Sequence, residues 1–105
     1  MKSLSVEIVR YVDDHQPGWV ECRFRDAAGC WYIFDEKVPI VTKVYLSRDS
    51  DYPQSGTIEC EVLEVWTDGE GRSLSKIDTS RPSGIESREG LKQFVVLSEL
   101  LRSAG

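Results

Sequence analysis

The segment DAAG, residues 26–29, constrains the fold more than any other stretch of this chain. Asp at its first position and Gly at its fourth are typical of a type I turn followed by a left-handed glycine, which closes a three-residue hairpin loop. Such a turn fixes the register of the two strands that it joins. The predicted pairs are Asp26 with Cys30, Phe24 with Tyr32, and Cys22 with Phe34. One face of this hairpin is then almost wholly apolar: Val20, Cys22, Phe24, Cys30, Tyr32 and Phe34.

Alternation of apolar and polar residues predicts strands on both sides of this hairpin. Residues 4–12 place Leu4, Val6 and Ile8 on one face. In residues 57–62, Ile58, Cys60 and Val62 point inward, whereas Thr57, Glu59 and Glu61 point outward. The alternation slips by one residue within VLEVW, residues 62–66, as a β-bulge would produce. Asp68-Gly69 is a hairpin signal, and residues 73–79 return as a shorter strand.

Two parts of the chain are less regular. Between residues 37 and 56, Pro39 interrupts the strand pattern, and the spacing of apolar residues predicts a packed connection with a short helix near 40–48. The apolar residues expected to be buried there are Ile40, Val41, Val44, Tyr45 and Leu46. Pro53 fits a turn, and Gly56 is free to adopt a left-handed conformation before the next strand. The composition of residues 81–90 predicts a solvent-facing loop.

The end of the chain is ambiguous between strand and helix over residues 88–102. Phe94 and Val96 alternate as in a strand, whereas Leu97, Leu100 and Leu101 recur as in a helix. We expect a strand near 92–97 and a short helical end, with one longer carboxy-terminal helix as the alternative.

These elements predict a mainly β fold in one domain, residues 1–105. Five or six antiparallel strands, with one bulge and one irregular connection, favour a curled sheet or small barrel of the OB-like or SH3-like kind. The order of three strands, a connection and two strands is also that of the OB-fold. An analogy at the level of the fold carries no function by itself.

The net charge of the chain indicates which classes of molecule it is expected to bind. The chain has 18 acidic and 13 basic residues, for a net charge of −5. Nucleic-acid binding depends on cations that face phosphates, so this balance argues against it and fits a basic protein partner better. Since no apolar run approaches the roughly 20 residues that cross a bilayer, we expect a cytoplasmic protein without a membrane contact.

Reactive chemistry has little support in the sequence. The three cysteines, Cys22, Cys30 and Cys60, lack metal or redox spacing and are expected to be small buried apolar residues without disulfide bonds. The lone histidine, His15, lies in a turn sequence and is expected to be solvated. The sequence contains no nucleophile or phosphate-loop motif. We therefore favour a non-enzymatic role and expect neither a metal nor another cofactor.

Aromatic residues are the remaining candidates for binding a partner. Trp and Tyr beside charged residues are typical of protein–protein hot spots. Arg25 is expected to oppose Trp31 in a cation–π pair. The candidate binding residues are Trp19, Arg25, Trp31, Glu59, Glu61 and Trp66. The competing interpretation is that the tryptophans close the ends of the barrel, and that Glu59 and Glu61 form a solvated strand face.

Several segments together resemble a group of small bacterial β-domain proteins without a known activity. They are GWVEC, DAAG, EKVPIV, YPQSGTIECEV and IDTSRPSGIES. The resemblance spans residues 17 to 96 and concerns turns, bulges and core positions. It implies a bacterial cytosolic origin and a free-standing domain, and it brings no site residues.

The leading prediction is a non-enzymatic domain that binds a basic protein partner through an acidic, aromatic-bearing β surface, as an immunity protein would bind a basic toxin. One alternative is a small ligand-binding or enzymatic barrel that uses Glu59, Glu61 or Arg25 in a cleft. The other is an OB-like binder of single-stranded nucleic acid, for which the candidate cations are Arg23, Arg25, Lys37 and Lys43. The oligomeric state stays open.

Overall fold

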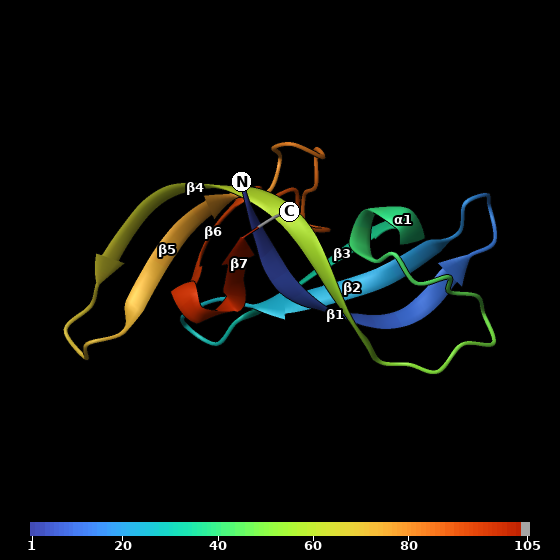
Figure 1. The fold of residues 1–105 in the computed structure, drawn as a ribbon, viewed down its shortest axis with the longest axis horizontal. Coiled ribbons are helices and arrows are strands. Elements are labelled where there is room, and N and C mark those ends of the chain that lie inside the picture. The colour runs from blue at the N-terminus through green and yellow to red at the C-terminus, as the bar shows by residue number, and fades with distance from the viewer. Residues whose placement is uncertain (104–105) are drawn as a thin grey trace.

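Seven strands form one antiparallel sheet that curls into a half-barrel in the computed structural model, which describes residues 1–103 (Figure 1). The order along the sheet is β3-β2-β1-β4-β5-β6, and β7 pairs with β1. The mainly β, curled-sheet prediction is therefore confirmed. The elements are β1 Lys2–Asp13, β2 Trp19–Arg25, β3 Trp31–Lys37, α1 Val38–Val41, β4 Gln54–Thr67, β5 Ser73–Asp78, β6 Gln93–Leu97, the 3-10 turn η1 Ser98–Leu100, and β7 Leu101–Ser103.

Strand β1 organises the sheet because it pairs with three neighbours. Its later half pairs with β2, from Glu7 opposite Arg23 onwards. Its earlier half pairs with β4 on one side and with β7 on the other, so that Lys2 lies opposite both Cys60 and Ser103. The two ends of the described chain consequently lie side by side (Figure 1).

The hairpin between β2 and β3 has the predicted register, with Phe24 opposite Tyr32 and Cys22 opposite Phe34. The Oδ1 atom of Asp26 accepts hydrogen bonds from the backbone N–H groups of Ala28 and Cys30. Gly29 adopts a φ of 86°, the left-handed conformation that the turn requires. The tip of the hairpin also contacts β6, at the other edge of the sheet, where the Ala27 N–H donates to the carbonyl oxygen of Val95.

The turn between β4 and β5 repeats this design. Asp68 accepts from the N–H groups of Glu70 and Arg72, and Gly71 has a φ of 81°. The hairpin predicted from Asp68-Gly69 is therefore confirmed, and its left-handed residue is Gly71. The predicted bulge is confirmed as a register shift between Val62 and Glu64.

The core fills the concave side of the curled sheet. An aromatic cluster, in which the Phe24 and Phe94 rings lie edge to face at 5.0 Å, joins β2 and β3 to β6. Cys22 and Cys60 are buried as expected, but Cys30 is exposed because it lies where the hairpin leaves the core. The buried apolar cluster is Leu4, Val6, Ile8, Val20, Cys22, Phe24, Phe34, Val38, Val41, Leu46, Ile58, Cys60, Ile77, Ile85, Phe94 and Val96.

The connection after β3 differs from the prediction. Its helix is the single turn α1, which begins at Val38 and not near residue 40. One helical turn presents one face to the core, so Val38 and Val41, three residues apart, are buried. Leu46 is also buried, whereas three of the residues expected in the core are exposed to 41%, 59% and 86%: Ile40, Val44 and Tyr45.

The carboxy-terminal strand prediction is confirmed as β6, and the helical end is the single turn η1. The alternative of one longer helix is wrong. Leu101 begins β7 instead, because the early half of β1 offers a free edge for pairing. Within residues 1–103, neither helical segment has the length or the apolar character to cross a bilayer.

Candidate functional site

The outer face of the β2–β3 hairpin carries a tryptophan flanked by two arginines. The guanidinium carbon of Arg23 lies 4.2 Å from the centre of the Trp31 ring, and that of Arg25 lies 4.8 Å from it. Trp31 is nevertheless 43% exposed. We call Arg23, Arg25 and Trp31 the Trp31 clamp. The Arg25–Trp31 pair was predicted, whereas Arg23 was not assigned to it, although its place two residues before Arg25 puts it on the same face.

A shallow groove of about 390 Å³ borders the Trp31 clamp. Glu7 of β1 lies in it, and its Oε1 atom accepts a hydrogen bond from Arg23 Nε at 2.9 Å. Arg25 has no ion-pair partner among residues 1–103. The remaining groove residues are of both kinds. Three are polar, Ser5, Gln54 and Ser55, and four are apolar, Val6, Phe24, Pro53 and Leu100.

Trp19 lies at the opposite end of the same hairpin. It is partly buried, it opposes Lys37 in the register, and the Lys37 ammonium lies 5.7 Å from the centre of its ring. Both tryptophans of the hairpin therefore have a cation beside the ring.

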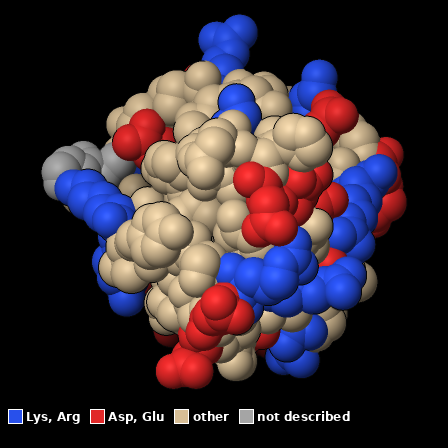
Figure 2. Space-filling view, turned by 90° about the vertical axis from the view of Figure 1, so that its right-hand side faces the viewer, with Lys and Arg blue, Asp and Glu red and all other residues tan. Residues whose placement is uncertain are grey.

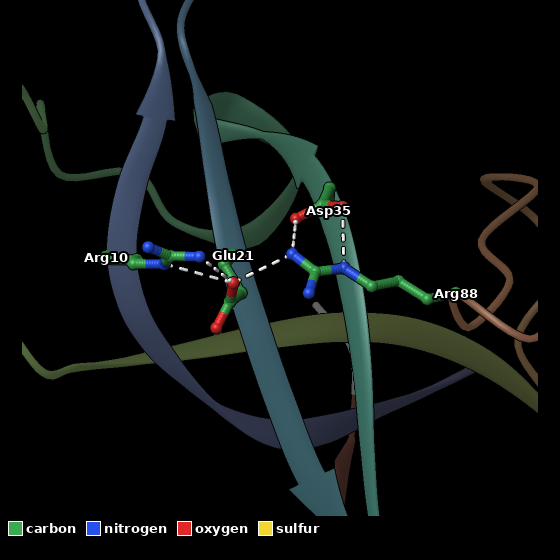
Figure 3. Close-up of polar contacts among 4 residues, drawn as sticks. All are labelled: Arg10, Glu21, Asp35 and Arg88. Atoms are coloured by element: carbon green, nitrogen blue, oxygen red, sulfur yellow. Dashed lines mark hydrogen bonds and ion pairs between the residues drawn. The ribbon is translucent and has the colours of Figure 1, made fainter.

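An ion-pair network joins β1, β2 and β3 to the segment between β5 and β6 (Figure 3). In the register of the hairpin, the pair of Glu21 and Asp35 lies between Trp19 and Trp31. Glu21 of β2 accepts from Arg10 Nη2 at 3.0 Å and from Arg88 Nη2 at 2.8 Å. Arg88 also donates to Asp35 Oδ1 at 2.8 Å and to Asp35 Oδ2 at 3.1 Å. Burial alone would raise the pKa of Glu21, but the hydrogen bonds from Arg10 and Arg88 outweigh it and hold the pKa below its ordinary value.

Arg88 comes from the segment that was expected to be a solvent-facing loop, and that prediction is wrong in part. Ile85 and Ser87 are buried, and the Arg88 N–H donates to the carbonyl oxygen of Ile33 in β3. The segment between β5 and β6 is thus tied to β3 by its backbone and by the ion pairs of Arg88.

The predicted acidic residues lie on β4, away from the Trp31 clamp. Glu59 is exposed and Glu61 is partly buried, and neither has an ion-pair partner within the described part of the chain. Glu59, Glu61 and Arg25 line three different hollows. The structure therefore does not assemble them into one catalytic centre.

Trp66 lies on the outer half of β4, opposite Leu74 of β5. It is partly buried and separated from the β2–β3 hairpin by the order of strands in the sheet. Of the six predicted binding residues, the structure brings Arg25 and Trp31 into contact and places Trp19 on the same hairpin. The other three are distributed along β4.

The cysteines and the histidine do not meet. Burial raises the pKa of the Cys22 thiol to about 12 and that of the Cys60 thiol to about 11. His15 is exposed in the β1–β2 turn, where a ring nitrogen lies 2.7 Å from the carboxylate of Asp13. Within residues 1–103, no three His, Cys, Asp or Glu side chains are grouped as ligands for a metal ion.

The end of the molecule formed by the β1–β2 turn, α1 and residues 42–53 shows that the exterior is not uniformly acidic. In Figure 2, acidic and basic side chains are intermixed around a central area of uncharged residues. Arg48 illustrates this pattern, since it pairs with Asp14 at 2.8 Å and its guanidinium carbon lies 5.5 Å from the centre of the Tyr11 ring.

Comparisons with family models, with curated proteins and with solved structures found no match for this chain.

Proposed function

We propose that this chain is a non-enzymatic protein-binding domain of bacterial, cytoplasmic origin, and that its contact surface is centred on the outer face of the β2–β3 hairpin. The observation that carries the proposal is the Trp31 clamp, an exposed tryptophan whose ring contacts two guanidinium groups. Tryptophan and arginine are the residues most enriched in interface hot spots. Their mutual stacking restricts their rotamers before binding, which lowers the entropic cost of association.

The charge pattern supports a basic partner. Glu59 and Glu61 lack ion-pair partners in residues 1–103, and the chain has a net charge of −5. Although they lie away from the Trp31 clamp, carboxylates without ion-pair partners attract a basic protein and accelerate its encounter with the chain. A basic toxin, for which this chain would be the immunity protein, has the chemistry that fits such a surface.

The test is a pull-down from the native host, followed by calorimetry with the purified partner. We expect a basic partner whose affinity falls by about thirtyfold or more in Trp31→Ala, the loss typical of a hot-spot residue. Tyr45→Ala is the matched control, because Tyr45 is 86% exposed and lies on the loop after α1. Recovery of no partner, recovery of acidic partners only, or equal binding by both variants would contradict the proposal.

A second function, binding of single-stranded nucleic acid, is favoured by one observation. Three of the four candidate cations lie on the β2–β3 hairpin with two tryptophans: Arg23, Arg25 and Lys37. Carboxylates share this surface, however, since Glu7 pairs with Arg23 and Asp35 pairs with Arg88. Fluorescence anisotropy with an oligothymidylate at low and high salt tests this second function, because binding through phosphates weakens steeply as the salt concentration rises.

A further inference from the structure

We infer that the Trp31 clamp binds a carboxylate attached to an aromatic or apolar group, as an acidic and aromatic segment of the partner protein presents. The inference rests on the proposed protein-binding function and specifies the chemistry of the partner at this site. The partner, although basic overall, would then carry one acidic residue that binds at this site.

The charge of the groove comes from Arg25. Arg23 is offset by Glu7 through an ion pair of 2.9 Å, whereas Arg25 faces no carboxylate within hydrogen-bond distance among residues 1–103. A guanidinium that stacks on an indole keeps the N–H donors on its edge free, and two of these donors match the two oxygens of a carboxylate. The groove thus has one cation, Arg25, that lies over the Trp31 ring and has no ion-pair partner among residues 1–103.

The apolar half of the site comes from Trp31 and Leu100. Trp31 is 43% exposed despite its two arginine neighbours, and Leu100 lines the same groove. A groove of about 390 Å³ accommodates one or two side chains of a peptide. Burial of an aromatic ring against the exposed part of the indole would remove apolar surface from water, next to the cation that holds the carboxylate.

The same geometry favours one carboxylate over a polyanion. At physiological salt the screening length is about 8 Å, so a single carboxylate at Arg25 responds mainly to the charges of the groove. A nucleic-acid strand would extend across the outer face and would meet Glu7 and Asp35, in a protein whose net charge is −5. The observations therefore favour a protein segment, and nucleic acid becomes an outcome of the test.

The test uses the simplest compound that carries both groups, N-acetylphenylalanine, with N-acetylphenylalaninamide as its uncharged counterpart. NMR follows the indole N–H signals of the three tryptophans during titration into the millimolar range. We expect the Trp31 signal to shift and saturate, with Trp19 and Trp66 as internal references that shift less. The amide should bind about fivefold more weakly, the loss expected for one exposed ion pair.

Two variants sharpen the result. Arg25→Gln should reduce binding of the acid to the level of the amide, and Lys37→Gln, which removes the cation beside Trp19, should leave it unchanged. Equal binding of acid and amide, equal shifts at all three tryptophans, or an unchanged Arg25→Gln would overturn the inference. So would tighter, steeply salt-dependent binding of an oligothymidylate at Trp31. If the partner pull-down still depends on Trp31 in any of these cases, the proposed function survives and only the acidic anchor is lost.

Discussion

At the scale of single residues, Gly56 shows how the absence of one side chain lets two elements meet. A Cβ atom at this position would lie 2.9 Å from Ile8 Cδ1 and 2.9 Å from the carbonyl oxygen of Val41. Gly56 lies within β4 and has no left-handed φ, so the prediction that it provides backbone freedom was wrong. Its role is to let α1 pack directly onto the sheet.

We therefore expect Gly56→Ala to destabilise the protein by about 1–3 kcal/mol, because a backbone oxygen and a core side chain must move to admit the methyl group. Gly69→Ala is the control, since a Cβ there meets nothing within 4 Å. The control should change the free energy of unfolding by less than about 0.5 kcal/mol. Urea denaturation measures both, and equal stability of the two variants would refute the packing role of Gly56.

The titration of His15 tests the local geometry of the β1–β2 turn. The hydrogen bond to Asp13 raises the pKa of His15 above its ordinary value of 6.5, and the negative charge of Asp14 adds to this effect. NMR titration should show a lower pKa in Asp13→Asn and a smaller decrease in Asp14→Asn. Because the folded pKa is raised, the contribution to stability is complete below the ordinary pKa and is lost as the pH rises through the folded value. A histidine pKa that Asp13→Asn leaves unchanged would contradict the contact.

At the scale of elements, the sequence predicts the hairpins between neighbouring strands, whereas it does not predict contacts between segments far apart in the chain. The β2–β3 hairpin was predictable because DAAG specifies both the turn and the register within a few residues. The same register placed Arg25 opposite Trp31. The attachment of Arg88 to Glu21 and Asp35 joins residues 67 and 53 positions apart, and no periodicity encodes such a contact. Strand β7 was missed for the same reason, because only β1 gives Leu101 and its neighbours a partner.

We therefore expect Arg88 to stabilise the segment between β5 and β6 against local opening. Arg88→Gln should accelerate hydrogen exchange of the Ile85 and Arg88-position amides by about tenfold, the effect of losing one hydrogen bond to a charged group. Arg48→Gln removes an exposed ion pair with Asp14 and should leave these amides unchanged. Exchange is measured by NMR or mass spectrometry. Equal rates in both variants would mean that the ion pairs of Arg88 do not hold the segment, which its other hydrogen bonds would then hold without them.

At the scale of the whole molecule, acid should weaken the fold. The pKa values of four carboxyls are held below their ordinary values of 3.8 for Asp and 4.5 for Glu: Asp13, Glu21, Asp68 and Asp78. Hydrogen bonds to the charged forms lower them, against the opposing effect of burial at Glu21. Each such group stabilises the folded state above its ordinary pKa, and this stabilisation is lost as the pH falls through the lowered folded value.

The expected result is a urea midpoint that falls between about pH 5 and about pH 2, where paired carboxyls gain protons. Glu21→Gln should flatten part of this dependence, because it removes the most buried of the four groups. A midpoint that stays constant or rises on acidification would contradict the assignment of these ion pairs and hydrogen bonds.

The place of β1 between β4 and β7 determines the order in which the strands of the sheet can pair. Lys2 is synthesised long before Ser103, which is one of its two pairing partners. The edge of β1 that receives β7 therefore stays unpaired until β7 has been made, and unpaired edges invite association with other chains. A protein built this way depends on how fast β7 pairs with β1, since contacts between residues distant in sequence form slowly.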